Sequence, residues 1–209
     1  APTLSSVNLA SNNSTSTLAK AGDVVTVTFT ASESITTPTV TFTSGGDSIT
    51  NSPSYNHTSG DTWTASYTVA SADTDGAVAY SIAYTDTSSN AGTAVTSGTG
   101  SVTIDTTAPT VSSVTTIAPT TTDNTPSFVL NSSEAGTLVS LIDSGTPLAL
   151  SSTAAVIGDN TVTYSALSDG TYDGNLVCVE DASGNRTCLG GISCTVAPTG
   201  PTMAITRAS

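Results

Sequence analysis

The stretch Val25–Thr30 reads Val-Thr-Val-Thr-Phe-Thr, a strict alternation of apolar and hydroxyl-bearing side chains. Successive side chains of a β-strand point to opposite faces, so this order places the two valines and Phe29 on one face and the threonines on the other. One apolar face and one wet face are typical of an antiparallel sheet packed against a second layer. The stretch therefore predicts a half-buried strand of a layered all-β fold.

The composition of the whole chain also indicates an all-β protein. About a third of the 209 residues are Ser or Thr, and only 9% are charged. Helix formers such as Leu, Glu and Lys are scarce, whereas Val, Thr, Ile and Tyr recur in short runs that suit a pleated surface. No segment reads as an amphipathic helix. By the same alternation, Trp63 and Tyr67 are predicted to lie in the core or at its rim.

A repeated phrase divides the chain. Residues 1–7 read Ala-Pro-Thr-Leu-Ser-Ser-Val, residues 108–114 read Ala-Pro-Thr-Val-Ser-Ser-Val, and a third copy begins at Ala197. The intervals of 107 and 89 residues each match one immunoglobulin-type sandwich. We predict two tandem immunoglobulin-like β-sandwich domains, 1–107 and 108–196. Residues 197–209 are then the start of a third repeat or a tail that donates a strand elsewhere.

Turn residues separate the expected strands of each domain, because Gly, Asn and Asp fill the gaps between the apolar runs. The first domain is predicted to have strands at Leu4–Ser11, Asp23–Ser32, Thr39–Ser44, Thr62–Ala70, Ala77–Asp86 and Gly100–Asp105, with a weak extra strand at Ile49–Tyr55. The second is predicted to have strands at Val111–Ile117, Ser127–Ser132, Thr137–Ile142, Thr161–Ala166, Asn175–Glu180 and Arg186–Val196.

The charge balance narrows the classes of partner. Three basic residues against sixteen acidic ones give a formal net charge of −13. Binding to nucleic acid or to an anionic membrane needs a cluster of Lys or Arg, which this chain lacks, so we expect neither partner. Divalent cations are better candidates. No stretch is long and apolar enough to span a bilayer, so we expect no membrane insertion by this segment and no signal peptide within it.

The three cysteines lie close together in the sequence. If Cys178 and Cys188 stand on paired strands around the turn Asp181–Asn185, they face each other at a separation that a disulfide can bridge. The competing pair is Cys188 with Cys194, around two glycines. We predict the bond between Cys178 and Cys188, with Cys194 left over. A disulfide favours an oxidising compartment, so we expect an extracellular or cell-surface location.

Four segments resemble the bacterial immunoglobulin-like repeats of large cell-surface adhesins: Lys20–Glu33, Asp105–Val111, Asp123–Pro126 and Glu180–Asn185. The resemblance covers nearly the whole chain and implies an immunoglobulin-like fold, with a role as stalk, spacer or adhesion module. Two features depart from the family. Asp86–Asn90 stands where the family has a tighter Asp-x-x-Gly-Asn turn, and the cysteines are atypical of these repeats.

Acidic residues are predicted to gather where the two domains join. In an immunoglobulin-like sandwich, the last strand ends at the pole from which the next domain starts. This topology brings Asp105 of the first domain toward Glu134 and Asp181 in loops of the second. Carboxylates that converge repel one another unless a cation such as Ca²⁺ lies among them. We predict a calcium site at Asp105, Glu134 and Asp181, with Asp73 and Asp75 as further contributors. The alternative is that all five are ordinary solvated turn residues.

Two further sequence features bear on chemistry. Glu33 and Asp86 are the positions in the first domain that correspond to Glu134 and Asp181. The run Gly-Asp-Ser ending at Ser48 resembles the nucleophile block of one lipase and esterase family, but there the serine opens a helix. The sole histidine, His57, is the only imidazole available to such a serine, and no oxyanion-hole glycine run accompanies it. We therefore predict no catalytic residues.

Together these features predict a non-enzymatic structural or adhesive segment at a cell surface. Tandem domains would form a rod that projects a distal binding site, with neighbouring repeats or subunits of the same protein and a surface receptor or matrix as partners. The alternative is a self-assembling filament subunit, in which Pro201–Arg207 completes the sheet of a neighbouring molecule. A sugar-binding module would need an exposed aromatic platform, and the chain has only one Trp, six Tyr and three Phe.

Overall fold

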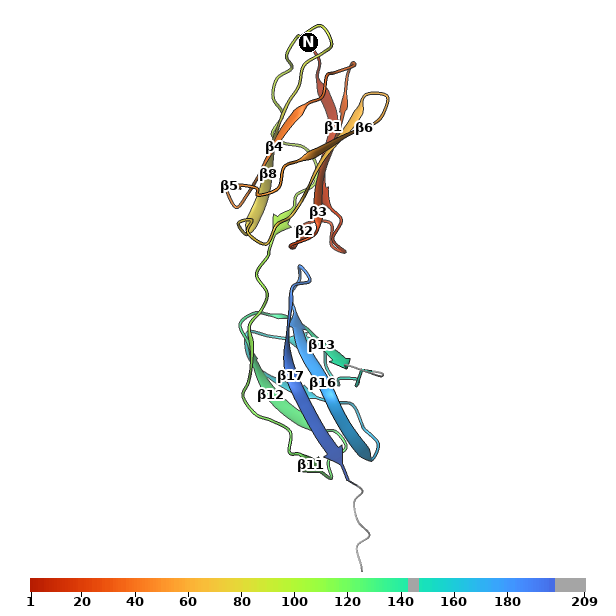
Figure 1. Cartoon of the computed structure of the whole chain (residues 1–209), viewed down its shortest axis with the longest axis vertical. Helices are drawn as coiled ribbons and strands as arrows, with labels where there is room; N and C mark the ends of the chain where they lie inside the picture. The colour runs from red at the N-terminus through yellow and green to blue at the C-terminus, as the bar shows by residue number, and fades with distance from the viewer. Residues whose placement is uncertain (143–146, 198–209) are drawn as a thin grey trace, which may run out of the picture. The chain divides into compact units, whose positions relative to one another are not determined.

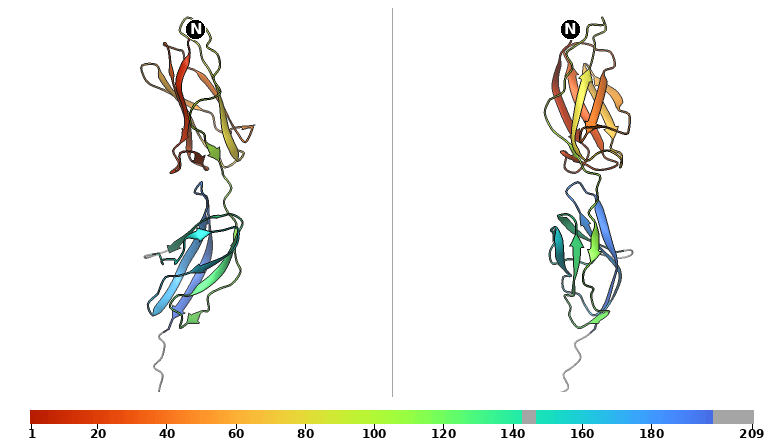
Figure 2. Two further views of the ribbon diagram at one scale, coloured as in Figure 1. Left: turned by 180° about the vertical axis from the view of Figure 1, so that it is seen from behind. Right: turned by 90° about the vertical axis from the view of Figure 1, so that its left-hand side faces the viewer.

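The computed structural model describes residues 1–142 and 147–197, and within these ranges it contains β-strands and no helix. The chain forms two compact units: unit 1 is Ala1–Thr107 together with Ala182–Asn185, and unit 2 is Ala108–Asp181 together with the residues from Arg186 onward. Figures 1 and 2 show that each unit consists of two β-sheets packed face to face. Among the described residues, no helix is present that could cross a membrane. The predicted third repeat or tail at 197–209 lies outside the described residues from position 198 onward.

Unit 1 is an immunoglobulin-like sandwich. One sheet has the strand order β1-β3-β7-β6 and the other has the order β2-β9-β8-β4-β5. This order is the Greek key of the immunoglobulin fold, in which the first, second and fifth main strands share a sheet opposite the third, sixth and seventh. The strands are β1 Leu4–Ser11, β2 Leu18–Ala19, β3 Val24–Ala31, β4 Thr39–Ser44, β5 Asp47–Ser48, β6 Ser54–Ser59, β7 Thr62–Thr68, β8 Gly76–Ala83 and β9 Thr103–Ile104.

The core of unit 1 follows the alternation in β3. Val25, Val27 and Phe29 are fully buried, while the threonines between them remain partly exposed. Trp63 and Tyr67 on the neighbouring β7 are buried as expected, and the Tyr67 ring packs 4.9 Å from the ring of Phe42 in the opposite sheet. The apolar faces of the two sheets therefore meet in one core.

The predicted extra strand at Ile49–Tyr55 is wrong in position. Residues 49–53 connect β5 in one sheet to β6 in the other, and pairing with β7 begins at Ser54. Pro53 has no N–H group to contribute to a ladder, so a strand starts more readily after it than across it.

The last predicted strand of unit 1, Gly100–Asp105, is reduced to β9. The preceding segment runs irregularly between the two sheets. Val95 pairs with Ile82 in β8, whereas the backbone of Thr99 bonds to β1, accepting from Leu9 N at 2.9 Å and donating to Val7 O at 2.8 Å. This segment closes one side of the sandwich through backbone hydrogen bonds to β1, and Gly100 lets its backbone approach Leu9 closely.

Unit 2 repeats the plan with one strand fewer in its first sheet. The orders are β10-β12-β15 and β11-β17-β16-β13-β14. The smaller sheet leaves unit 2 with the smaller described core. The strands are β10 Val111–Ser113, β11 Thr120–Thr121, β12 Ser127–Ser132, β13 Gly136–Ile142, β14 Ala154–Ala155, β15 Gly158–Thr163, β16 Gly170–Glu180 and β17 Arg186–Val196.

The predicted strand at Thr161–Ala166 starts three residues too late, because β15 begins at Gly158. Asn160 occupies an inward position and is only 7% exposed, which hides the alternation in the sequence. Its side chain is satisfied locally: Oδ1 accepts from Val156 N at 2.7 Å, and Nδ2 donates to Val156 O and Gly158 O at 2.8 Å. A polar residue can therefore point inward here without an unpaired amide.

Candidate functional site

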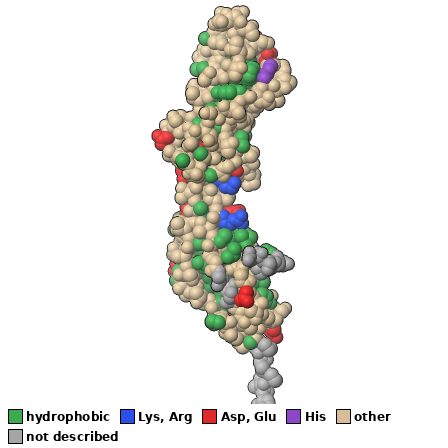
Figure 3. All heavy atoms as spheres, viewed as in Figure 1, with side chains coloured by type: hydrophobic (Ala, Val, Ile, Leu, Met, Phe, Trp, Pro, Cys, Tyr) green, Lys and Arg blue, Asp and Glu red, His purple; other side chains and the backbone are tan. Residues whose placement is uncertain are grey.

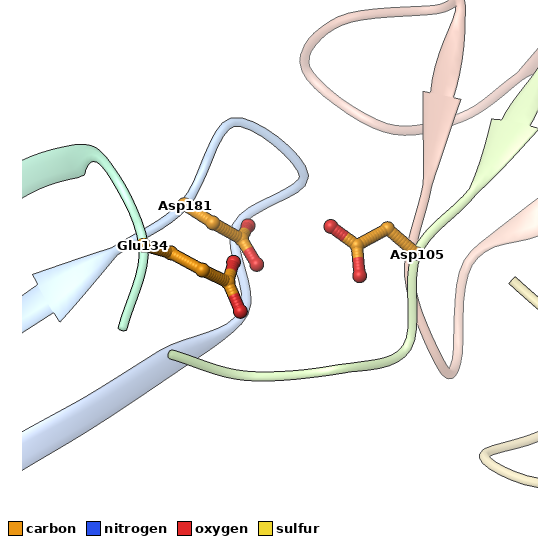
Figure 4. Close-up of side chains that lie close together, drawn as sticks. All are labelled: Asp105, Glu134 and Asp181. Carbon is orange, nitrogen blue, oxygen red and sulfur yellow. The ribbon is translucent and has the colours of Figure 1, made fainter. Parts of the chain in front are cut away.

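The strongest candidate site lies in two loops at one pole of unit 2. Glu134 is in the loop between β12 and β13, and Asp181 follows β16 in the turn to β17. A carboxylate oxygen of Glu134 lies within 4.8 Å of one of Asp181. Figure 4 shows both side chains extending from their loops in the same direction. Two ionised carboxylates at this separation repel each other, so the pair favours a nearby cation or hydrogen-bond donors.

Local hydrogen bonds fix the backbone of the Glu134 loop. Ser132, at the end of β12, is 1% exposed, and its Oγ donates to Glu134 O at 2.7 Å. The same Oγ accepts from Glu134 N at 3.3 Å. These two hydrogen bonds form a tight turn at the end of β12 and fix the backbone position of Glu134.

A disulfide braces the hairpin that carries Asp181. Cys178 and Cys188 are bonded to each other and stand opposite in the pairing of β16 with β17. The last pair before the turn is an ion pair, with Arg186 Nε 3.5 Å from Glu180 Oε2. Cys194, the remaining cysteine, is a buried free thiol, and its burial, with the charge of Asp173, raises its pKa.

Asp105, the third acidic residue that the sequence singles out, closes unit 1. It directly follows β9, and its backbone N donates to Ala19 O at 2.9 Å. Its Oδ1 accepts a hydrogen bond from Thr107 N at 3.1 Å. This bond forms a short turn at the end of unit 1. Figure 4 also draws this side chain.

The two further predicted contributors have structural partners inside unit 1. Asp73 is 5% exposed, and its two oxygens accept from Thr50 N at 2.8 Å and Ala70 N at 2.9 Å. Asp75 Oδ1 accepts from the backbone N and the hydroxyl of Thr106, at 2.6 and 2.8 Å, and its Oδ2 accepts from the Thr107 hydroxyl at 2.6 Å. These carboxylates fasten a turn and the end of unit 1.

The position of unit 1 that corresponds to Asp181 forms a self-contained turn. Asp86 is 6% exposed; its Oδ1 accepts from Ser88 N and Asn90 N at 2.9 and 2.8 Å, and its Oδ2 accepts from Asn90 Nδ2 at 2.8 Å. Ser89 adopts a φ of 69°, the left-handed conformation that a glycine would take more easily. Ser89 takes the place that Gly184 has in the turn between β16 and β17, and the hydrogen bonds of the Asp86 carboxylate to Ser88 and Asn90 hold the turn in this conformation. Glu33 is exposed.

Hydrogen bonds, first of all from the Asn90 side chain, hold the pKa of Asp86 below its ordinary value of 3.8. A carboxyl whose pKa is lowered by folding stabilises the protein above the unfolded pKa, and this stabilisation is lost as the pH falls through the lower folded value. We expect an NMR titration to place the Asp86 pKa below 3.8, and Asn90→Ala to raise it. Urea unfolding followed by Trp63 fluorescence measures the free energy of unfolding at about pH 7 and at about pH 3. The decrease in this free energy from about pH 7 to about pH 3 should be smaller in Asp86→Asn than in the parent.

Glu33→Gln is the control, because Glu33 is an acidic residue in the neighbouring loop after β3 and its side chain is exposed. It should leave the acid dependence of unit 1 unchanged. A titration of Asp86 at or above 3.8 would contradict the prediction.

The residues of the lipase-like run have no catalytic arrangement. Ser48 is exposed in the two-residue strand β5, which pairs with Thr43 of β4 as part of a tight hairpin. His57 is exposed on β6; its ring stacks on Trp63 with centroids 4.5 Å apart, and its Nε2 contacts Gly60 O. These contacts anchor the edge strand β6, and no helix follows Ser48, which lies in the β4–β5 hairpin.

Sequence reasoning missed what the repeated Ala-Pro-Thr phrase does. In unit 1, Thr3 N donates to Ser32 Oγ at 3.0 Å, and Ser32 N donates to Thr3 O at 2.9 Å. In unit 2, Thr110 N donates to Ser133 Oγ at 2.8 Å, and Ser133 N donates to Thr110 O at 3.0 Å. The signal was present, since a Ser-Glu pair directly follows the second main strand of both domains. The repeated phrase therefore joins the N-terminal residues of each unit, by two hydrogen bonds, to the serine that follows its second main strand.

Basic side chains are few in the part of the chain that the structure describes. On the face in Figure 3, uncharged polar side chains and backbone predominate, with acidic side chains scattered among them. Lys20 and Arg186 are the basic residues within the described ranges, and both form ion pairs with acidic neighbours, Asp23 and Glu180.

No protein-family model matches the chain, and no curated protein sequence matches it significantly. Among solved structures, the fibronectin(III)-like modules of Clostridium thermocellum CbhA are 14% identical, with 100% of this chain and 98% of that chain covered and a TM-score of 0.45. A three-domain immunoglobulin structure of titin is 13% identical over 93% of this chain and 65% of that one, with a TM-score of 0.42. The D00-D0 domain of intimin is 12% identical over 90% and 99%, with a TM-score of 0.32. The strand order therefore carries the assignment of fold, and the resemblance to adhesin repeats stays a prediction.

Proposed function

We propose that this chain is a non-enzymatic spacer segment of an extracellular rod or adhesin. The observation that carries the proposal is how the connection between the units is fastened. In unit 1, Asp75 accepts hydrogen bonds from Thr106 and Thr107. In unit 2, Thr110 exchanges two hydrogen bonds with Ser133.

Only Ala108 and Pro109 lie between these fastened residues. A two-residue connection that includes a proline has little slack, because the proline ring restricts φ and each flanking residue is held by its own unit. A spacer needs this property, since a slack linker would let the distal part fold back toward the surface. The Cys178–Cys188 disulfide supports an extracellular setting.

We further propose that Ca²⁺ stiffens the connection, with Asp105, Glu134 and Asp181 as ligands. The proposal is supported by the adjacency of Glu134 and Asp181 in unit 2, and by the position of Asp105 at the end of unit 1. Calcium takes six to eight oxygen ligands, so backbone carbonyls and water would complete the site. The expected dissociation constant is about 10⁻⁴–10⁻³ M, the range of extracellular modules.

Small-angle scattering tests the proposal directly. In millimolar Ca²⁺ we expect a longer and straighter particle than in chelator, because a cation shared by both units would oppose bending. Asp105→Asn should abolish the difference, whereas Asp169→Asn, at an exposed aspartate of unit 2, should preserve it.

Identical scattering in both buffers, with no calorimetric Ca²⁺ signal at millimolar concentration, would remove calcium from the proposal. A particle mass that grows with protein concentration would instead favour the filament alternative.

A further inference from the structure

Strand β6 of unit 1 forms an open sheet edge. It ends the strand order β1-β3-β7-β6, and no strand that the structure describes pairs with its other side (Figure 1). All residues of β6, Ser54–Ser59, are exposed, and none of them is charged at neutral pH apart from a protonated fraction of His57. An edge strand without charged side chains is a template for pairing with a strand of another chain. The edge of β6 is therefore the place where copies of this chain would associate unless something covers it.

The other long edges of unit 1 have cover. Thr99 exchanges two backbone hydrogen bonds with β1. On β4, the Tyr55 hydroxyl accepts a hydrogen bond from Val40 N at 2.9 Å and donates one to Val40 O at 3.2 Å. The short strand β5 pairs with the remaining end of β4, at Thr43 and Ser44. Cover is therefore needed at β6.

An acceptor sequence for asparagine-linked glycosylation lies within β6. Five Asn-x-Ser/Thr sequences occur in the chain, beginning at Asn12, Asn13, Asn56, Asn131 and Asn185. The one in β6 is Asn56-His57-Thr58, and its threonine is exposed at the irregularity in the pairing with β7. Its asparagine side chain is exposed and forms no hydrogen bond with the residues that the structure describes.

The Asn56 side chain also points away from the core. Asn56 stands opposite Thr64 of β7. Thr64 lies between Trp63 and Ala65, which are both buried, so it faces outward and Asn56 shares its face. A group attached to Asn56 would therefore extend into solvent beside the open edge.

The amides at Asn13 and Asn131 are already engaged in the fold. Asn13 Nδ2 donates to Asp23 Oδ2 at 2.7 Å, and Asn131 Nδ2 donates to Asp159 Oδ1 at 2.7 Å. A glycan replaces one of the two hydrogens of Nδ2, and its bulk would crowd the acceptor that the nitrogen holds.

The remaining two acceptor sequences are also less open than the one in β6. Asn12 is exposed, but its Oδ1 accepts a hydrogen bond from Val24 N at 2.7 Å, which fixes its amide against the start of β3. Asn185 is half-buried. Asn56 thus combines an exposed side chain with an amide that the fold does not use.

We propose that Asn56 carries an asparagine-linked glycan and that this glycan shields the open edge of β6. The inference rests on the extracellular setting of the proposed function. The co-reactant is an oligosaccharide joined to a lipid through pyrophosphate. Nδ2 forms a bond to C1 of the first sugar and loses one proton, while the bond between C1 and the pyrophosphate oxygen breaks and the lipid pyrophosphate leaves. The bulky, hydrated glycan then blocks the approach of a second strand.

Peptide mapping of the full chain tests the site, after secretion from insect cells, which attach asparagine-linked glycans. We expect Asn56 to be occupied in most molecules and the other four asparagines in a small minority. Thr58→Ala should abolish the glycan at Asn56, and Thr58→Ser, which keeps the acceptor sequence, should retain it. An unoccupied Asn56, or equal occupancy at another asparagine, overturns the inference and leaves the spacer function standing.

Analytical ultracentrifugation of the same proteins tests the shield. Thr58→Ala should self-associate with a dissociation constant at least about tenfold lower than that of the glycosylated chain or of glycosylated Thr58→Ser. Adding Ser54→Lys to Thr58→Ala should restore the monomer, because a charge on an edge strand opposes pairing. Equal association with and without the glycan overturns the shielding role. Association that Ser54→Lys leaves unchanged also overturns it, because the contact then lies outside β6, as the filament alternative would require.

Discussion

Replacing Leu130 with alanine should unfold unit 2 under conditions in which unit 1 stays folded. Leu130 lies in β12, is fully buried and belongs to the smaller of the two described cores. Deleting its side chain removes apolar burial and leaves a cavity, at a cost of about 2–5 kcal/mol. A domain of this size is stable by about 5–15 kcal/mol in total, so the loss is a large fraction.

Calorimetry of the variant should show two separate transitions, with the lower one shifted by about 4–8 °C for each kcal/mol lost. The sole tryptophan, Trp63, lies in unit 1, so its fluorescence should report an unchanged transition while the far-ultraviolet signal changes. Val129→Ala is the matched control, because Val129 is in the same strand on the partly exposed face. A single shifted transition seen by both probes would show that the units do not unfold independently.

Replacing Gly100 with alanine should destabilise unit 1 by about 2–5 kcal/mol, from backbone strain and lost hydrogen bonds together. Gly100 has a φ of +74°, and an added Cβ would lie 2.1 Å from Leu9 O. The obstacle is backbone, which a side-chain rotation cannot relieve. Either β1 or the segment around Thr99 must move, and the two hydrogen bonds between Thr99 and β1 would weaken.

Gly46→Ala separates the two causes. Gly46 also has a positive φ, +97°, but an added Cβ would meet nothing within 4 Å. It should therefore show only the conformational cost, about 1–2 kcal/mol. Urea unfolding followed by Trp63 fluorescence measures both variants. If Gly100→Ala is no worse than Gly46→Ala, the close approach to Leu9 does not limit this part of the fold.

The candidate site was predictable in part. The sequence indicates which loops carry Glu134 and Asp181, because the order of strands in an immunoglobulin-like sandwich sets which turns share a pole. It could not separate them from Asp73 and Asp75, since all are acidic residues in or near turns. That distinction depends on donors distant in sequence, such as Thr50 N for Asp73 and the Thr106 hydroxyl for Asp75.

The prediction of strand positions from alternating apolar and polar residues succeeded for some strands and failed for others. Alternation located β3 and β4 to within a residue, because an apolar face that must be buried leaves a period of two in the sequence. Alternation failed at β15, where inward-facing Asn160 breaks the period, and at β6, where every residue is exposed and no period exists.

By itself, the sequence determined the all-β class, the repeated plan and the strands with one buried face, since these depend on local alternation and on a phrase that recurs. Tertiary structure alone decided the rest. The short strands β2, β5, β11 and β14 exist only because a neighbouring strand supplies backbone partners. The partners of each carboxylate also depend on folding. Asp73 and Asp75 stabilise turns and Glu134 lies beside Asp181 because segments distant in sequence come together, and no local sequence pattern predicts this.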